Sequence, residues 1–446
     1  MQQISNGELL FEENTEELLS MIQKRQNRNA MKIEIKRSCI EEILLLVLFG
    51  FYVLVAHWIW FGRGIQETIM IVLSVLVLLK SVRLRYVSVR MIPSLILAGI
   101  LFVICVIGVF QSETSEYLVA DLKSMLGTII VSMAIIAAIK KLTASGYNLM
   151  DFLFVFLNRF FVLNDILIII QFFVPYFLMN RKAIVSVNNS AYFDQLTGLL
   201  GINGTTRWDI WSIAIIILNF YIGYKRNDER IIKYNIAFFL VSMVICMMNS
   251  AKSFLIIAPI TVLIYLFMVR KVQITSRIKQ VLVVFGVLIV GMIAYSSNSY
   301  INEFVNDLIN DKFAIYLSGD IDYMVAANDD RAVATVFAAK NCGTFGVGIG
   351  TVPMHTSNSQ VKYLGLNSAS SYIYMTGVAG YFLWTLCLAR IGIHRGKGST
   401  KKTILHFSYL LLLSYLLPIF STIALFPAIL FIFYIFDLEQ SQKERG

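Results

Sequence analysis

Long apolar runs recur along the whole chain, and most have the length that a helix needs to cross a bilayer. A spanning helix takes about 20 predominantly apolar residues. We predict about twelve transmembrane helices, at residues 40–60, 65–80, 92–110, 125–140, 160–179, 208–224, 234–248, 252–269, 280–296, 370–391, 403–417 and 419–436. The pairs at 234–269 and 403–436 are the least sharply separated. Because barrel strands alternate apolar and polar positions, these unbroken runs exclude a transmembrane β-barrel.

The composition agrees with this pattern. Of the 446 residues, 57% are hydrophobic and only 15% are charged, and the mean hydropathy is +0.71. A soluble domain with this balance would have a surface as apolar as its core. The chain is therefore predicted to be an all-α, polytopic membrane protein.

The basic residues predict the orientation of the helices. Most of the 38 Lys and Arg residues lie before the first predicted helix, in every second connection and at the C-terminus. Because cytoplasmic loops carry an excess of Lys and Arg, we expect both termini in the cytoplasm. The net charge of +10 is then mainly a topology signal and does not indicate nucleic-acid binding.

The predicted helices divide the chain into five parts. These are an N-terminal cytoplasmic tail (1–38), nine transmembrane helices (39–296), a long outer loop (297–368), three further transmembrane helices (369–436) and a C-terminal cytoplasmic tail (437–446). The acidic first thirty residues do not resemble a signal peptide, and Met31 is an alternative start. The five cysteines show neither disulfide nor metal-ligand spacing, so we expect no metal and no cofactor.

The long outer loop is where we expect the chemistry. Loops of that length in a compact protein are usually functional or disordered, and this one carries patterned glycine, aromatic and charged residues. A short helix is predicted from about Asp329 to Lys340, ending at a turn on Gly343. Its two aspartates, Asp329 and Asp330, are suited to capping the start of that helix.

Cations are scarce on the predicted outer side, so each one is informative. Arg207, Lys252 and Arg331 each stand where a helix begins, and a cation at the membrane face is suited to binding a phosphate or pyrophosphate. The alternatives are snorkelling to lipid headgroups, or a surface pair of Arg207 with Asp209. Lys340 lies nine residues after Arg331, on the opposite face of a regular helix, so the two cannot clamp one phosphate.

Proton acceptors are less clearly indicated. Asp330 is one candidate general base, and His355 is the loop residue whose ordinary pKa lies nearest neutrality. Both have simpler roles as a helix cap and as an exposed polar residue. Inside the membrane, Arg159, Asn164, Asp165 and Gln171 form a polar run, placed toward the inner half, that suits either function or an interhelical contact.

The run Gly346-x-Gly348-x-Gly350 lacks the spacing and the preceding strand of a dinucleotide fingerprint. Its glycines more simply allow tight turns and a close approach to a ligand or a helix. After the loop, the amide and hydroxyl groups from Asn367 to Tyr374 open the next predicted helix, where they are suited to lining a sugar-binding surface.

Three places in residues 150–390 resemble the O-antigen ligase and polymerase superfamily. The first is the helix-opening basic motif Ser250-Ala-Lys252-Ser253-Phe-Leu, and the second is Arg331 followed by the Gly346–Gly350 run. The third is Asn367, nine residues, Gly377, two residues and Gly380. In ligases a histidine stands just before this last motif, whereas here the residue is Leu366, which favours a Wzy-type repeat-unit polymerase.

The resemblance implies a GT-C-like fold and metal-independent glycosyl transfer on the outer face of a bacterial inner or plasma membrane. The substrates would be undecaprenyl-diphosphate-linked oligosaccharides, and the product would be O-antigen, capsule or exopolysaccharide. Arg331, Asp330 and His355 would be catalytic, while Arg207, Ser250, Lys252, Gly348, Gly350 and Asn367 would bind substrate. A chain-length regulator and a flippase would be partners, and an O-antigen ligase or a lipid-linked oligosaccharide transporter is the alternative function.

Overall fold

The computed structural model describes residues 39–55, 63–83, 96, 99–103, 106, 118–174, 177–178, 196–201, 204–249, 251–270, 330–350, 364–365, 367–391, 399–420 and 423–443. All regular elements in these ranges are helices, which confirms the predicted all-α class. The predictions for Ser250, His355, Leu366, the N-terminal tail and the span 280–296 lie outside the described residues, as does most of the span 92–110. Of the predicted C-terminal tail, residues 437–443 are described and are helical.

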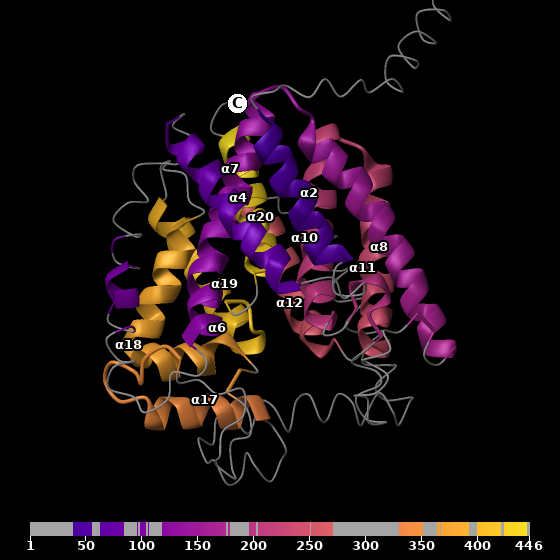
Figure 1. Ribbon diagram of the computed structural model, residues 1–446. Coiled ribbons are helices and arrows are strands. Elements are labelled where there is room, and N and C mark those ends of the chain that lie inside the picture. Colours follow the sequence, from indigo (N-terminus) through magenta and orange to yellow (C-terminus); the bar gives the residue numbers. More distant parts are fainter. Residues whose placement is uncertain are drawn as a thin grey trace, which may run out of the picture. The chain divides into compact units, whose positions relative to one another are not determined.

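The helices follow one another in the order shown in Figure 1. They are α2 (Ile40–Leu54), α4 (Arg63–Arg83), α6 (Leu118–Leu122), η3 (Lys123–Gly127), α7 (Thr128–Ala144), α8 (Leu149–Phe173), η6 (Gly198–Leu200), α10 (Thr205–Arg226), α11 (Glu229–Met248), α12 (Lys252–Leu263), η7 (Ile264–Val269), α17 (Asp330–Asn341), α18 (Ser368–Ile391), α19 (Ser399–Leu416) and α20 (Phe426–Lys443).

Ten of the predicted spans coincide with described helices, with shifted ends. The pairs that were hard to separate are distinct, because α11 ends at Met248 before α12 begins, and α19 ends at Leu416 before α20 begins. The largest shift is in α8, which starts at Leu149 instead of residue 160. That start places Asn164, Asp165 and Gln171 in the second half of the helix.

Among the described residues, five helices are long and apolar enough to cross a membrane. They are Gly64–Ser81, Lys123–Ala144, Leu149–Phe173, Glu229–Met248 and Ser368–Ile391, and Ser253–Val269 is a shorter apolar helix. Two of the outward faces are rich in exposed apolar side chains, such as Leu163 on α8 and Val244 on α11. This is the arrangement of a helical membrane protein, since lipid covers such faces.

The helix α10 lies at the centre of the described bundle. Its residues from Arg207 to Gly223 are all buried, and it packs against α8, α11, α12 and α20 (Figure 1). A helix that is apolar on all sides must be surrounded by other elements. The start of α10 is therefore held by neighbours on every side, which makes it a rigid base for a site.

Four ion pairs join helix ends at one level of the bundle, whereas Lys123 pairs with Glu67 at the opposite level, near the start of α4. Three of the four pairs link a residue near the start of one helix with a residue near the end of another. The remaining pair links two helix ends. The pairs are Lys141–Glu42 at 2.6 Å, Arg226–Asp151 at 2.8 Å, Arg270–Glu439 at 2.5 Å and Lys402–Asp437 at 2.8 Å. These links agree with the alternating helix directions that the basic residues predict.

Candidate functional site

The helix α17 lies crosswise to most of the other helices and packs against α18 (Figure 1). Its bounds, Asp330–Asn341, agree with the predicted helix to within a residue, and Gly343 follows with a φ of 64°. The small side chains of Ala334 and Ala338 are fully buried, which lets the two helices approach closely. The start of α17, where Arg331 stands, is thereby held against the bundle.

The helix α18 is broken at Gly377, whose φ of 75° and ψ of 166° are not helical. Because of the break, carbonyl groups just before Gly377 lack the backbone N–H donors that a continuous helix would supply. Loop residues replace them: the N–H of Val347 donates to the Tyr374 carbonyl at 2.9 Å, and the N–H of Gly348 donates to the Met375 carbonyl at 3.0 Å. The Gly346–Gly350 run thus docks through its backbone onto the broken helix.

Glycine is required at this contact for steric reasons. A Cβ atom on Gly346 would lie 2.2 Å from the Met375 carbonyl oxygen, and one on Gly377 would lie 2.5 Å from the Thr344 carbonyl oxygen. Both residues also have positive φ, which disfavours any side chain. The interpretation of the glycine run as a means of close approach to a helix is confirmed.

The last glycine of the run is tied to a different helix. The N–H of Gly350 donates to Asp121 Oδ2 at 2.8 Å, which links the loop to α6. Burial raises the pKa of this carboxyl group from 3.8 to about 6, against the lowering effect of the Gly350 hydrogen bond. The loop is therefore anchored at both α18 and α6.

Asn367 connects the start of α18 to the start of α17. Its Oδ1 accepts from the Ser370 N–H at 2.8 Å, as a helix N-cap does. Its Nδ2 donates to Thr335 Oγ1 at 3.1 Å, and the Thr335 hydroxyl donates to the Arg331 carbonyl at 2.9 Å. Asn367 is fully buried. Through Thr335, Asn367 therefore holds the first turn of α17, which carries Arg331.

The starts of α10, α12 and α17 meet at one polar cluster centred on Asp209. This carboxyl group is 1% exposed, and its Oδ2 accepts a hydrogen bond from the Ser253 hydroxyl at the start of α12. Arg331 of α17 lies within electrostatic range of Asp209. The structure therefore brings together the three helix starts that carry Arg207, Lys252 and Arg331. We call Asp209, Ser253 and Arg331 the outer cluster.

Arg207 lies in the interior of the bundle and not at its surface. Arg207 is 2% exposed, and its Nη2 donates to the Leu200 carbonyl at 2.6 Å, which ties α10 to η6. Asp209 is buried as well and bonds Ser253. The alternative of an exposed Arg207–Asp209 pair is wrong, because neighbouring helices cover both side chains.

The polar run on α8 holds the segment before α10. The Asn164 Oδ1 accepts from the Leu199 N–H at 2.8 Å, and the Gln171 Oε1 accepts from the Gly198 N–H at 2.9 Å. The indole N–H of Trp208 donates to Asp165 Oδ1 at 2.8 Å. Of the two roles considered for this run, the structure shows the interhelical contact.

The remaining predicted residues are placed only in part. Lys252 and Asp330 are the first residues of α12 and α17, and only their backbones are described. Ser250 and His355 lie outside the described residues. Gly348 and Gly350 use their N–H groups within the protein, as described above.

Two residues of the site were not identified from sequence. Ser253 was noted only as part of a motif, and nothing in the sequence marks Asp121 as a partner of the loop. Both act through residues distant in the chain, so local patterns carry no sign of them. No protein-family model matches the chain, and no curated protein matches it.

Proposed function

We propose that this protein polymerises polyprenyl-diphosphate-linked oligosaccharide repeat units into a surface polysaccharide, by glycosyl transfer on the outer face of a bacterial inner or plasma membrane. The observation that carries the proposal is the outer cluster. In it, Ser253 at the start of α12 bonds Asp209 near the start of α10, and Arg331, on a helix held by α18, lies within electrostatic range of Asp209. The resemblance of the motifs to the ligase and polymerase superfamily supplies the substrate class.

The proposed reaction needs a cation where the leaving group departs. The acceptor sugar hydroxyl attacks the anomeric carbon of the donor chain, and the bond from that carbon to the pyrophosphate oxygen breaks. Arg331 stabilises the negative charge that develops on the polyprenyl diphosphate. Helix starts add to this effect, because backbone N–H groups and the helix dipole favour an anion there.

The hydroxyl proton must pass to a base during the attack. Asp330, the first residue of α17, and His355 in the same loop are the candidate acceptors. Asp209 is a less suitable base, because its carboxyl group is buried and held by Ser253. We assign it a positioning role at the start of α10, with Asn367 and Thr335 fixing the helix that carries Arg331.

Depletion of the protein in its host tests the function. A polymerase predicts that single repeat units reach the outer anchor while long chains disappear. Full-length chains retained on the polyprenyl carrier indicate a ligase instead, which Leu366 disfavours. Repeat units stranded on the inner leaflet indicate a transporter, which the concentration of cations and loop on one side disfavours.

The variant Arg331→Ala tests the assigned residue. We expect it to abolish long chains, a loss of at least about a hundred-fold, because removing a charged contact to the transition state costs about 3 kcal/mol or more. Lys340→Ala is the matched control, since Lys340 is exposed at the other end of the same helix. Glycan length is read on a gel, and membrane insertion is checked by immunoblot. Normal chain lengths in Arg331→Ala would refute the pyrophosphate role.

A further inference from the structure

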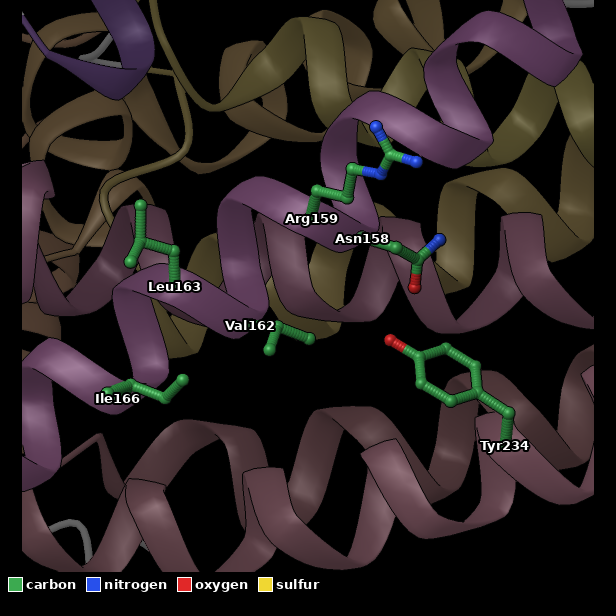
Figure 2. Close-up of a pocket in the computed structure, with 6 residues that line it drawn as sticks. All are labelled: Asn158, Arg159, Val162, Leu163, Ile166 and Tyr234. Carbon is green, nitrogen blue, oxygen red and sulfur yellow. The ribbon is translucent and has the colours of Figure 1, made fainter.

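An open groove lies between α8 and α11, on the outside of the bundle. Its volume is about 300 Å³, and its lining is Asn158, Arg159, Val162, Leu163, Ile166 and Tyr234 (Figure 2). Leu163 and Ile166 are about half exposed, and Tyr234 is 40% exposed. The groove is separate from the outer cluster and plays no part in the proposed reaction.

The groove is amphipathic along its length. In Figure 2 the polar ends of Asn158 and Tyr234 lie at one side of the groove, whereas Leu163 and Ile166 lie toward the other; the Arg159 side chain starts beside Asn158 and its guanidinium points away from Tyr234. Exposed apolar side chains continue the apolar part on both helices, including Ile169 on α8 and Val241 on α11. A molecule with a polar head and an apolar tail matches this division.

Arg159 gives the groove its charge. Its side chain is exposed, and no carboxylate of the described ranges forms an ion pair with it. A charged residue on a lipid-facing helix is costly unless it reaches a partner or the interface. The neighbouring Asn158 does not supply that partner, because its amide exchanges two hydrogen bonds with Asn219, at 2.7 and 2.9 Å.

Arg159 lies near the middle of α8, so it meets a lipid phosphate only with its side chain extended toward the start of the helix. Ten residues separate it from Leu149 at the start of α8, which is about 15 Å along the axis. The helix has 25 residues, about 37 Å in length, so it exceeds the roughly 30 Å of a hydrocarbon core. An extended arginine at this position reaches toward the headgroup level while its stem stays among acyl chains.

The near end of the groove carries further positive charge. The turn between α10 and α11 holds Lys225, Arg226, Arg230 and Lys233 against two acidic residues. It lies at the level of the α8 start, because Arg226 pairs with Asp151 at 2.8 Å. Basic segments of this kind mark the cytoplasmic side and attract anionic lipids.

We propose that the groove between α8 and α11 binds one anionic phospholipid of the cytoplasmic leaflet. The lipid phosphate pairs with Arg159 and accepts from the Tyr234 hydroxyl, and one acyl chain lies along Val162, Leu163 and Ile166. This assignment does not depend on the proposed glycosyl transfer. It explains why a lipid-facing helix carries a charged side chain. Among the described residues, no carboxylate of the bundle pairs with that charge.

Lipid binding to the purified, delipidated full-length protein tests the proposal. Native mass spectrometry measures the affinity for phosphatidylglycerol and for phosphatidylcholine with the same acyl chains. We expect the protein to bind phosphatidylglycerol about ten-fold more tightly, and Arg159→Gln to remove that preference. Lys401→Gln, which removes an exposed charge near the start of α19 and outside the groove, keeps the preference. Val162→Trp fills the groove and weakens binding with Arg159 intact.

Three outcomes would overturn the proposal. Equal binding of the two lipids by the unaltered protein means that Arg159 only snorkels to the interface. An unchanged preference in Arg159→Gln places the anionic site elsewhere. A dimer in lipid nanodiscs that dissociates in Arg159→Gln means that a second copy, not a lipid, occupies the groove. Thermal unfolding of each variant in detergent verifies that the variant is folded. If Arg159→Gln does not fold, Val162→Trp still tests the groove.

Discussion

Gly346 and Gly377 bring two backbones into contact at the outer loop, and no other residue type fits there. The Thr344 carbonyl oxygen would lie 2.5 Å from a Cβ on Gly377, and the Met375 carbonyl oxygen 2.2 Å from a Cβ on Gly346. The neighbouring Gly343 also has positive φ, yet a Cβ there meets no atom within 4 Å. Identical residues in one loop therefore serve different purposes.

The change Gly346→Ala tests this steric requirement. We expect it to destabilise the protein by about 3 kcal/mol or more, because it adds both a clash with backbone and an unfavourable φ. Gly343→Ala is the control, and only the conformational term of about 1 kcal/mol applies to it. Thermal unfolding in detergent measures both. Equal losses of stability in the two variants would contradict the close contact with Met375.

At the scale of elements, the broken helix α18 is the feature that organises the loop. Its break at Gly377 leaves carbonyl groups that accept hydrogen bonds from Val347 and Gly348. The same loop is tied to α6 through Gly350 and Asp121. Two helices distant in the chain, α18 and α6, thus hold the segment that follows α17. That segment in turn helps to hold α17, which carries Arg331.

The link to α6 predicts a dependence on pH. The pKa of Asp121 is about 6 in the folded protein and ordinarily 3.8. Between about pH 4 and pH 6 the folded state keeps a proton that the unfolded chain has released. Stability from this group therefore falls as pH rises through that window and stays low above it.

Asp121→Asn should remove that dependence and raise the unfolding midpoint at pH 7. The amide oxygen still accepts from the Gly350 N–H, and no charge has to be buried. Glu229→Gln changes an exposed carboxyl group on α11 and serves as the control. Midpoints at about pH 4.5 and pH 7 give the comparison. A lower midpoint for Asp121→Asn at pH 7 would show that the ionised carboxylate stabilises the loop.

At the scale of the whole molecule, the arrangement of helix ends distinguishes two sides. The ion pairs that join helix ends include Arg226–Asp151 and Lys402–Asp437, in connections rich in basic residues. The starts of α10, α12 and α17 carry the outer cluster instead. Charge at one end and the cluster at the other agree with a protein that acts on one face of a membrane.

Cysteine labelling tests this topology. We expect a membrane-impermeant maleimide to label Lys340→Cys in intact cells, and Lys233→Cys only after permeabilisation, since both positions are exposed. The background from native thiols at Cys39, Cys246, Cys342 and Cys387 should be low, because these four are buried. Labelling of Lys233→Cys in intact cells would reverse the assigned orientation.

Sequence alone was enough to predict the all-α class, ten of the described helices and the short loop helix starting at Asp330. Apolar runs and helix-end residues are local properties, and the bilayer sets one length for every span. Arg331 was likewise recognisable, because a cation at a helix start in a polar loop stands out from an apolar chain. The start of α8 was misplaced, since polar residues in its first half interrupt the apolar run.

Only the tertiary structure decided which residues act together. Arg207 and Asp209 looked like an exposed pair, yet packing buries both and gives them different partners, Leu200 and Ser253. The glycine run resembled a binding loop, whereas its N–H groups satisfy a helix that Gly377 breaks. Such contacts join segments far apart in the chain. They depend on how helices pack in three dimensions, which the order of residues along one helix does not reveal.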